Sequence, residues 1–341
     1  MSKKDLNAIL KNGFKNQNEF SEIYLNFQKR LNSLKQQFFL IAVSGGPDSL
    51  ALTALSKAYS YNNNCKIFYV LIDHKLRKNS SKEASSVKKL LKKHKIKITI
   101  IKNKKKITKN IQNEARNVRY DLLKSFCKKN KIKYILTAHH LNDQVETFFI
   151  RLSRGSGLDG LSSMRQITNL ENNIQVVRPL LDLKKNKLTQ LSRKVFGKYY
   201  LDPSNEDEKY LRIRIRKLKK ILEKSGINYD QISKSIKNLA SSRDTLEIYF
   251  NKIYRETVRK KKSSVLINFK NLSSLNLEMK IKVFKKSIKD FTNAYYTPRS
   301  KKVLNLIEQI YSKKNARLTL GGCLVFRDQN HIILVKELKK Q

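Results

Sequence analysis

Residues 37–138 alternate short apolar runs with longer segments of helical spacing, and this alternation restricts the possible folds more than any other feature. The runs at 38–43, 67–72, 96–101 and 134–138 are continuous and too short for helices, so we predict buried strands. Helical spacing of apolar residues follows each run, at 48–60, 81–94, 108–130 and 142–153. This alternation predicts right-handed crossovers and an α/β fold with a doubly wound parallel sheet. A ligand of such a sheet binds beyond the carboxyl ends of the strands.

The pattern changes after about residue 217. Residues 221–258 have basic, helical spacing, the run 259–262 predicts a loop, and further helices are expected at 279–291 and 301–311. Residues 317–326 and 331–335 predict a C-terminal β-hairpin. We therefore expect a helical extension at 1–36, a catalytic domain at 37–217, and a smaller, mainly helical, basic domain at 218–341 that ends in the hairpin.

The charge of the chain points to a polyanionic partner. Its 341 residues include 74 lysines and arginines against 27 acidic residues, a formal net charge of +47. Such an excess attracts nucleic acid by counterion release, while a membrane surface or lysine drift in an AT-rich genome are the alternatives. Three scattered cysteines exclude a disulfide framework and a Cys-x-x-Cys metal site. No apolar run is long enough to span a bilayer, so we expect a cytoplasmic protein without a membrane partner.

The first chemical motif follows the first predicted strand and begins a helix. Two glycines allow close approach of the backbone to a ligand, and a helix N-terminus favours an anion. Two serines add hydroxyl donors, and an aspartate here would repel phosphate unless a divalent cation joined them. Neither a Walker loop nor a dinucleotide fingerprint is present, and an ordinary capped turn is the alternative. The residues of this motif are Ser44, Gly45, Gly46, Pro47, Asp48 and Ser49.

Three further polar clusters lie just after predicted strands or in helices that follow them. Asp143 and Glu146 lie three apart on one helical face, with His139 just before the helix, so they could bind Mg²⁺ and orient a water or substrate. For a single cluster the alternative is a structural role, in which these residues cap a helix and pair with lysines. This alternative is weaker when every cluster lies at the end of a strand. The other clusters are Asp73, His74 and Arg77, and Arg116 with Arg119, which share a helical face.

These motifs resemble those of a known family. The loop at 44–49 is similar to the pyrophosphate loop (PP-loop) of the ATP-pyrophosphatase superfamily, whose fold is Rossmann-like and which includes GMP synthetases, asparagine synthetases and tRNA thiolases. The whole set resembles the tRNA(Ile)-lysidine synthetase family over residues 41–216. The matching strings are Asp73-His74-x-Leu76-Arg77, Ala115-Arg116-x-x-Arg119-Tyr120, Ala138-His139-His140-x-x-Asp143-Gln144-x-Glu146-Thr147, Arg154-Gly155-Ser156-Gly157, Arg178-Pro179-Leu180-Leu181 and Asp202-Pro203-Ser204-Asn205.

The resemblance continues weakly at Thr297-Pro298-Arg299 and Leu320-Gly321-Gly322-Cys323, and it has one departure inside the catalytic domain. Family members usually carry Arg-Asn-x-x-Arg after the Asp-Pro-Ser-Asn string, whereas this chain has Ile213 in place of the asparagine. That departure leaves the role of Arg212 and Arg216 open.

The resemblance implies a reaction. An ATP-dependent ligase would join free L-lysine to carbon 2 of the wobble cytidine in tRNA(Ile) with a CAU anticodon, through an adenylated cytidine. The lysidine product changes codon reading from AUG to AUA. The cofactors would be ATP and Mg²⁺, the basic helices after 217 would bind tRNA, and both a monomer and a homodimer are open.

The resemblance also implies a role for each matched residue. Asp48, Arg116, His139, Asp143 and Glu146 would be catalytic, with Asp48 and Asp143 holding Mg²⁺. ATP would be bound by Ser44, Gly45, Gly46, Pro47, Asp48, Ser49, Asp73, His74 and Arg77. The tRNA or the substrate base would be bound by Arg119, Arg151, Arg154 and Arg178.

Three other functions compete with this interpretation. A tRNA thiolase of the same superfamily would carry sulfur on cysteine, often in Cys-x-x-Cys pairs, which this chain lacks. An amidotransferase-type synthetase would need a glutaminase domain with an N-terminal catalytic cysteine, which we do not expect here. A basic RNA-binding protein with a degenerate nucleotide site would need a broken PP-loop, and every residue of the loop is intact.

Overall fold

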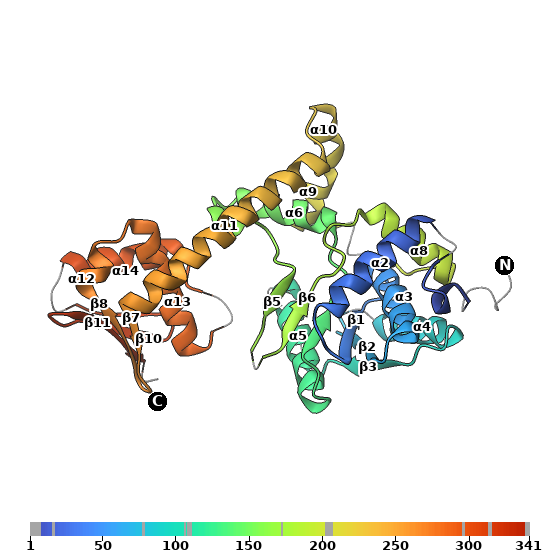
Figure 1. Ribbon diagram of the computed structural model, residues 1–341, viewed down its shortest axis with the longest axis horizontal. Coiled ribbons are helices and arrows are strands. Elements are labelled where there is room, and N and C mark those ends of the chain that lie inside the picture. Colours follow the sequence, from blue (N-terminus) through green and yellow to red (C-terminus); the bar gives the residue numbers. More distant parts are fainter. Residues whose placement is uncertain are drawn as a thin grey trace. The chain divides into compact units, whose positions relative to one another are not determined.

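The computed structural model describes residues 8–15, 18–76, 79–105, 107, 111–171, 173–201, 207–294, 297–312 and 316–337. The chain forms two compact units, Met1–Ala240 and Ser241–Gln341, which are described separately below (Figure 1). Within the described residues, no helix is both long and apolar enough to cross a membrane.

The first unit is built on a six-stranded sheet with the order β3-β2-β1-β4-β6-β5. Four neighbouring pairs are parallel, and only β5 (Ile167–Asn169) runs antiparallel, against β6 (Gln175–Val177). The predicted doubly wound parallel sheet is confirmed. The central strands are β1 (Phe38–Val43), β2 (Lys66–Asp73), β3 (Ile98–Lys102) and β4 (Tyr134–Leu136). The strand order reverses between β1 and β4, so a ligand site is expected where these two strands end.

Helices cover both faces of this sheet because successive strand residues point to opposite sides. Phe39 and Ile41 of β1 pack with one helical layer, and Leu40 packs with the opposite helix. The first layer consists of α2 (Asn18–Asn32), α3 (Pro47–Asn62), α4 (Ser80–Lys93) and α8 (Lys185–Phe196) (Figure 1). The opposite face is covered by α5 (Ile111–Lys129). The expected N-terminal extension therefore contains a helix, α2, whose apolar side belongs to the core of the first unit.

The two units divide inside α11 (Tyr229–Thr257), at Ala240/Ser241, and not at the expected position 217/218. The reason is an apolar cluster in which Leu141 and Val145 of α6 (Leu141–Leu152) pack against Ile232 and Ile236 of α11. This packing keeps the first turns of α11 with the catalytic part of the chain. The short helices α7 (Leu158–Leu161), α9 (Leu211–Lys217) and α10 (Lys219–Lys224) also belong to the first unit.

The second unit combines helices with a five-stranded antiparallel sheet of order β7-β8-β11-β10-β9. The predicted hairpin is present as β10 (Cys323–Arg327) and β11 (His331–Lys336), but its expected first arm at 317–326 is two strands, because the chain turns at Gly321 and Gly322 and β9 (Arg317–Leu320) pairs antiparallel with β10. The core forms between this sheet and α13 (Leu277–Thr292) and α14 (Ser300–Ser312). The remaining elements are α12 (Phe269–Ser273), β7 (Val258–Lys260) and β8 (Ser264–Asn268).

The loop expected at 259–262 was partly wrong, because Arg259 and Lys260 lie in β7. This strand is at the edge of the sheet, with Val258 buried and the two basic residues exposed. Exposed basic side chains are common on edge strands because they prevent pairing with other chains. They also hide the strand from a search for apolar runs.

Candidate active site

The PP-loop motif lies between β1 and α3, at the point where the strand order reverses. The buried hydroxyl of Ser49 organises this loop: its Oγ accepts hydrogen bonds from the backbone N–H groups of Ser44 (3.2 Å) and Gly45 (3.1 Å) and donates to the carbonyl of Gly46 (3.0 Å). Ser49 therefore shapes the loop from inside, while Ser44 is exposed at its surface.

Gly45 is required by both its conformation and its surroundings. Its φ of +87° lies in the left-handed region, and a Cβ atom there would come within 2.5 Å of Cγ2 of Val87. Gly46 is the N-cap of α3, and Pro47 occupies the first turn, where its missing N–H is not needed. The first-turn N–H groups of a helix have no acceptor within the helix and, with the helix dipole, favour an anion. This loop therefore suits the binding of a phosphate chain.

One buried imidazole joins the two acidic residues of the site. Nε2 of His140 lies 3.5 Å from Oδ2 of Asp48 and 3.5 Å from Oδ2 of Asp143. Asp48 comes from the first turn of α3, after β1, and Asp143 from the first turn of α6, after β4, so His140 joins the two predicted residues at the switch point. His140 was not among the predicted site residues. Its signal was its position three residues before Asp143, which forms a capping box at the start of α6.

The charges of this group follow from its contacts. Burial alone would lower the pKa of His140, but its hydrogen bond to Asp48 and the charge of Asp143 raise the pKa. Burial would raise the pKa of Asp143, and the two neighbouring histidines and Arg212 lower it instead. Asp143 is therefore ionised near neutral pH, while Nε2 of His140 carries a proton.

The two carboxylates fit Mg²⁺ in one specific way. Oδ1 of Asp48 is buried and has no hydrogen-bond partner among the described residues. In that same part of the chain, no group of three or more histidine, cysteine or acidic residues is arranged to hold a metal by itself. Mg²⁺ typically takes one or two carboxylates and fills its remaining positions with water and substrate phosphates. The residues present therefore suit Mg²⁺ that arrives with a nucleotide.

His139, which precedes His140, is held neutral. Its Nδ1 lies 2.9 Å from Oγ1 of Thr137. Burial lowers its pKa to about 3, with the charges of Arg178, Arg116 and Arg212 adding to the decrease and that of Asp143 opposing it. An imidazole with this pKa forms hydrogen bonds but takes up a proton poorly at neutral pH.

The carboxylate of Glu146, which we expected to be catalytic, is bound by an arginine side chain. The Glu146 side chain is 2% exposed, and its Oε1 and Oε2 accept hydrogen bonds from Nε (2.7 Å) and Nη2 (3.1 Å) of Arg216. Nε of Arg212 lies 3.4 Å from Oε2 of Glu146, and its Nη2 donates to Thr147. The two arginines whose role the sequence left open therefore fasten α9 to α6. Ile213, which departs from the family pattern, lies between the two arginines in the sequence, and its side chain is buried.

The second and third clusters come together beside the sheet. Asp73 is buried at the end of β2 and accepts hydrogen bonds from the backbone N–H of Lys75 (3.0 Å) and the hydroxyl of Ser81 (2.6 Å). Nε of Arg119 donates to Nε2 of His74 at 3.4 Å, and burial together with Arg119 lowers the pKa of His74 to about 4. Asp73 thus shapes the turn before α4, and Arg77 lies outside the described residues.

The other expected arginines differ in their surroundings. Arg116 lies over the ring of Tyr120, 5.1 Å from its centre. Nη1 of Arg151 donates to the carbonyls of Gly160 and Ser163, both at 2.8 Å. Nη1 of Arg178, which is buried, donates to the carbonyl of Arg165 and to Oγ1 of Thr168. Arg151 and Arg178 therefore hold chain segments around the site, while Arg154 is exposed in the loop after α6.

None of the three cysteines carries the features of a sulfur donor. Cys127 and Cys323 are buried in separate cores, and Cys65 packs at the edge of the main core. Burial raises the pKa of their thiols to about 12, 11 and 11 respectively. A reactive cysteine needs a lowered pKa, so these side chains act as packing residues.

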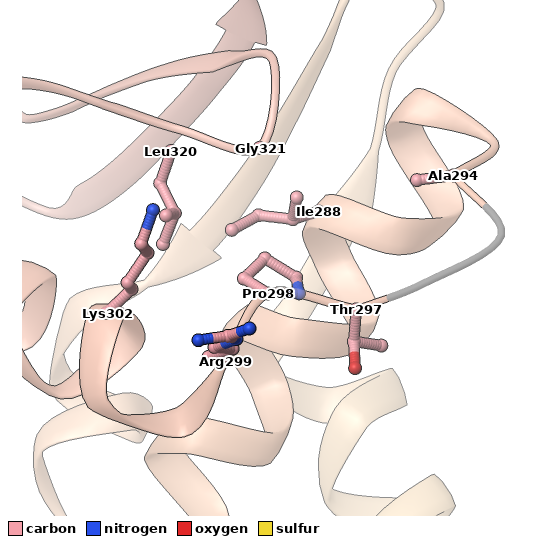
Figure 2. Close-up of a pocket in the computed structure, with 8 residues that line it drawn as sticks. All are labelled: Ile288, Ala294, Thr297, Pro298, Arg299, Lys302, Leu320 and Gly321. Atoms are coloured by element: carbon pink, nitrogen blue, oxygen red, sulfur yellow. The ribbon is translucent and has the colours of Figure 1, made fainter. Parts of the chain in front are cut away.

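A separate cavity of about 530 Å³ lies in the second unit (Figure 2). It brings together two weakly matching motifs, Thr297-Pro298-Arg299 before α14 and Leu320-Gly321 at the end of β9. Ile288, Pro298 and Leu320 give it apolar lining, and Arg299 and Lys302 supply positive charge. Gly321 has a φ of +62°, and a Cβ there would lie 2.9 Å from Cγ2 of Ile288, so this turn packs closely on α13.

The fold and site define a nucleotide-binding α/β enzyme of the PP-loop class, and the PP-loop domain family matches residues 18–222. The chain is 33% identical to the tRNA(Ile)-lysidine synthase of Wolbachia pipientis wMel over 323 residues, covering 93% of this chain and 75% of that protein. It is 31% identical to the same-named protein of Rickettsia bellii over 332 residues, covering 94% and 75%. The chain therefore belongs to the tRNA(Ile)-lysidine synthase family, as its motifs indicated.

A solved structure resembles this chain more distantly. The U34-tRNA thiolase NcsA from Methanococcus maripaludis, which contains a [4Fe-4S] cluster, aligns with a TM-score of 0.54 and 17% identity. The alignment covers 64% of this chain and 77% of that one. At this identity the likeness supports the fold alone. The thiolase alternative thus rests on a distant relative.

Proposed function

We propose that this chain forms lysidine in the cytoplasm, by ligating free L-lysine to carbon 2 of the wobble cytidine of a CAU-anticodon tRNA(Ile). O2 of the cytosine attacks the α-phosphorus of ATP, and pyrophosphate leaves. The ε-amine of lysine then attacks carbon 2, and AMP leaves with the former O2. Family membership supports the reaction, and the arrangement of the first unit supports the residue roles.

The observation that carries the proposal is the meeting of Asp48 and Asp143 beside the PP-loop. Both carboxylates lie at the carboxyl ends of adjacent strands, where a doubly wound sheet binds its ligand. The N-terminus of α3 would bind the pyrophosphate part of ATP, and the two carboxylates would hold Mg²⁺. Mg²⁺, when bound there, would offset the negative charge that develops on the departing pyrophosphate.

The other side chains supply orientation and charge. His139 remains neutral, so it can direct the cytosine or the lysine amine through a hydrogen bond rather than accept a proton. The positive charge of Arg116 contributes to the lowered pKa of His139, which supports a role for Arg116 near the reacting groups. Glu146 acts through Arg212 and Arg216, because both of its oxygens are bound to them.

The second unit supplies positive charge for tRNA. Its cavity presents Arg299 and Lys302, and its edge strand presents Arg259 and Lys260. Such groups contact phosphates without reading the base sequence. We assign them a share of the tRNA affinity and no part in the chemical steps.

The reaction is tested with purified protein, ATP, Mg²⁺ and CAU-anticodon tRNA(Ile), with and without free lysine. The expected product is a wobble cytidine whose mass increases by one lysine less water, and only when ATP and lysine are both present. The Asp143→Asn variant should lose this product. The control variant Asp121→Asn should keep it, because Asp121 is an exposed residue of α5 that pairs with Lys124. ATP cleavage without a mass increase would refute the proposal that lysine is the ligated substrate. Absence of ATP cleavage would refute the proposal of an ATP-dependent reaction on this tRNA.

A further inference from the structure

The side chain of His140 contacts both acidic residues of the candidate site. Its ring is 4% exposed, and the same nitrogen, Nε2, contacts carboxylates from the first turns of two different helices. One helix, α3, follows β1 and the other, α6, follows β4, so the contacts of this one nitrogen span the switch point of the sheet. The ring is thus in a position to set the distance between the two acidic residues.

The backbone around His140 determines which nitrogen faces the carboxylates. Its backbone is extended, and Nδ1 accepts a hydrogen bond from the N–H of Asp143 (3.4 Å). The N–H of His140 in turn donates to Oδ2 of Asp143 (3.1 Å). Since Nδ1 is an acceptor, the proton of the neutral ring is on Nε2. Protonation of the whole ring leaves Nε2 a donor as well.

Two carboxylates this close repel each other, and a shared donor offsets that repulsion. The donor takes up only one oxygen of Asp48, because Oδ1 remains buried without a partner among the described residues. The imidazole therefore holds the carboxylates near each other and leaves an oxygen available. Outer groups that orient metal-binding side chains in this way commonly change metal affinity by about 10- to 100-fold when removed.

We propose that His140 is the positioning residue that holds Asp48 and Asp143 ready for a divalent cation. The inference rests on the proposed function for the identity of the cation and nucleotide. The geometry of the three side chains is independent of which base the enzyme modifies.

The test separates this role from helix capping with two variants. Asparagine is a good N-cap, so His140→Asn should keep α6 capped, but its side chain is too short to reach Asp48. Glutamine places an N–H donor at nearly the reach of Nε2, so His140→Gln should restore part of the function. His94→Asn serves as the matched control, since His94 is also buried but contacts Phe196 instead of the site.

The measured quantity is the affinity for Mn²⁺, followed by electron paramagnetic resonance in the presence of the non-hydrolysable ATP analogue AMPCPP. We expect at least about a 10-fold weaker affinity in His140→Asn, a smaller loss in His140→Gln and no change in His94→Asn. Thermal unfolding of each variant shows whether it is folded. If His140→Asn does not fold, the Mn²⁺ affinity of His140→Gln decides the matter, and an affinity equal to that of the unmodified protein would then overturn the proposal.

Unchanged Mn²⁺ affinity in a folded His140→Asn protein would overturn the proposal. Equal losses in the asparagine and glutamine variants would overturn it too, because a donor at the right reach would then make no difference. If the unmodified protein forms no lysidine while His140→Asn still weakens Mn²⁺ binding, the proposed function fails and the positioning role stands.

Discussion

Replacing Arg216 with methionine would remove the guanidinium that holds the buried carboxylate of Glu146. The substitution breaks two hydrogen bonds, at 2.7 and 3.1 Å, so that among the described basic residues Glu146 keeps the longer contact to Arg212 at 3.4 Å. Removing one partner of a buried ion pair costs about 3–5 kcal/mol. A third of the Arg216 side chain is exposed and Arg212 remains, so we expect the lower end, about 3 kcal/mol. For a unit of this size, that loss lowers Tm by about 6–12 °C.

The assay is differential scanning calorimetry of the variant beside Lys217→Met, which changes the next residue of the same helix. Lys217 pairs with Glu208, and both side chains are more than half exposed, so this control should lose less than about 1 kcal/mol. The double variant Glu146→Gln/Arg216→Met removes the unpaired charge and should recover part of the loss. Equal Tm values for Arg216→Met and Lys217→Met would refute the reasoning, as would a double variant no more stable than Arg216→Met.

Four further predictions concern ligands and pH. Asp48→Ala should abolish pyrophosphate release, assayed enzymatically, while a filter assay still detects tRNA binding; loss of both would contradict the role of Asp48. Gly45→Ala should raise the KM for ATP, because the left-handed backbone alone costs about 1–2 kcal/mol with a side chain; an unchanged KM would be inconsistent with this. Hydrogen bonds overcome burial to lower the pKa of Asp73, so its stabilisation is present above the unfolded pKa of about 3.9 and disappears as pH falls through the folded pKa. The urea stability lost in Asp73→Asn should therefore shrink below about pH 4, and a constant difference would argue against it. Arg299→Gln with Lys302→Gln should weaken tRNA binding and reduce its salt dependence, whereas an unchanged slope of affinity against salt would exclude phosphate contacts there.

The central sheet could be predicted closely because its signals are local. The apolar run at 38–43 coincides with β1, and the run at 67–72 lies within β2. The missed strands β5 to β8 are three to five residues long, and their polar or basic residues leave at most three consecutive apolar residues in each strand. Their pairing depends on distant partners, which a local pattern does not contain.

The candidate site was predictable to the extent that its residues follow strands. Asp48 and Asp143 could be paired because parallel strands end at one edge of the sheet. Sequence spacing also suggested that Glu146 faces the substrate, yet its partner Arg216 lies 70 residues away and occupies it. The extended backbone before α6 determines which of the two adjacent histidines contacts both carboxylates. No sequence pattern predicted that backbone conformation.

The order of the strands has a consequence for the making of the protein on the ribosome. In the finished sheet β1 pairs with β4, with Phe39 opposite Tyr134, although two other strands and three helices intervene in the chain. A nascent chain that has emerged only through α5 contains the PP-loop but neither His140 nor Asp143. Contacts between distant segments form late because the loop between them must first close. The growing chain can thus form the PP-loop turn early, while the contact of His140 with both Asp48 and Asp143 awaits the insertion of β4 beside β1.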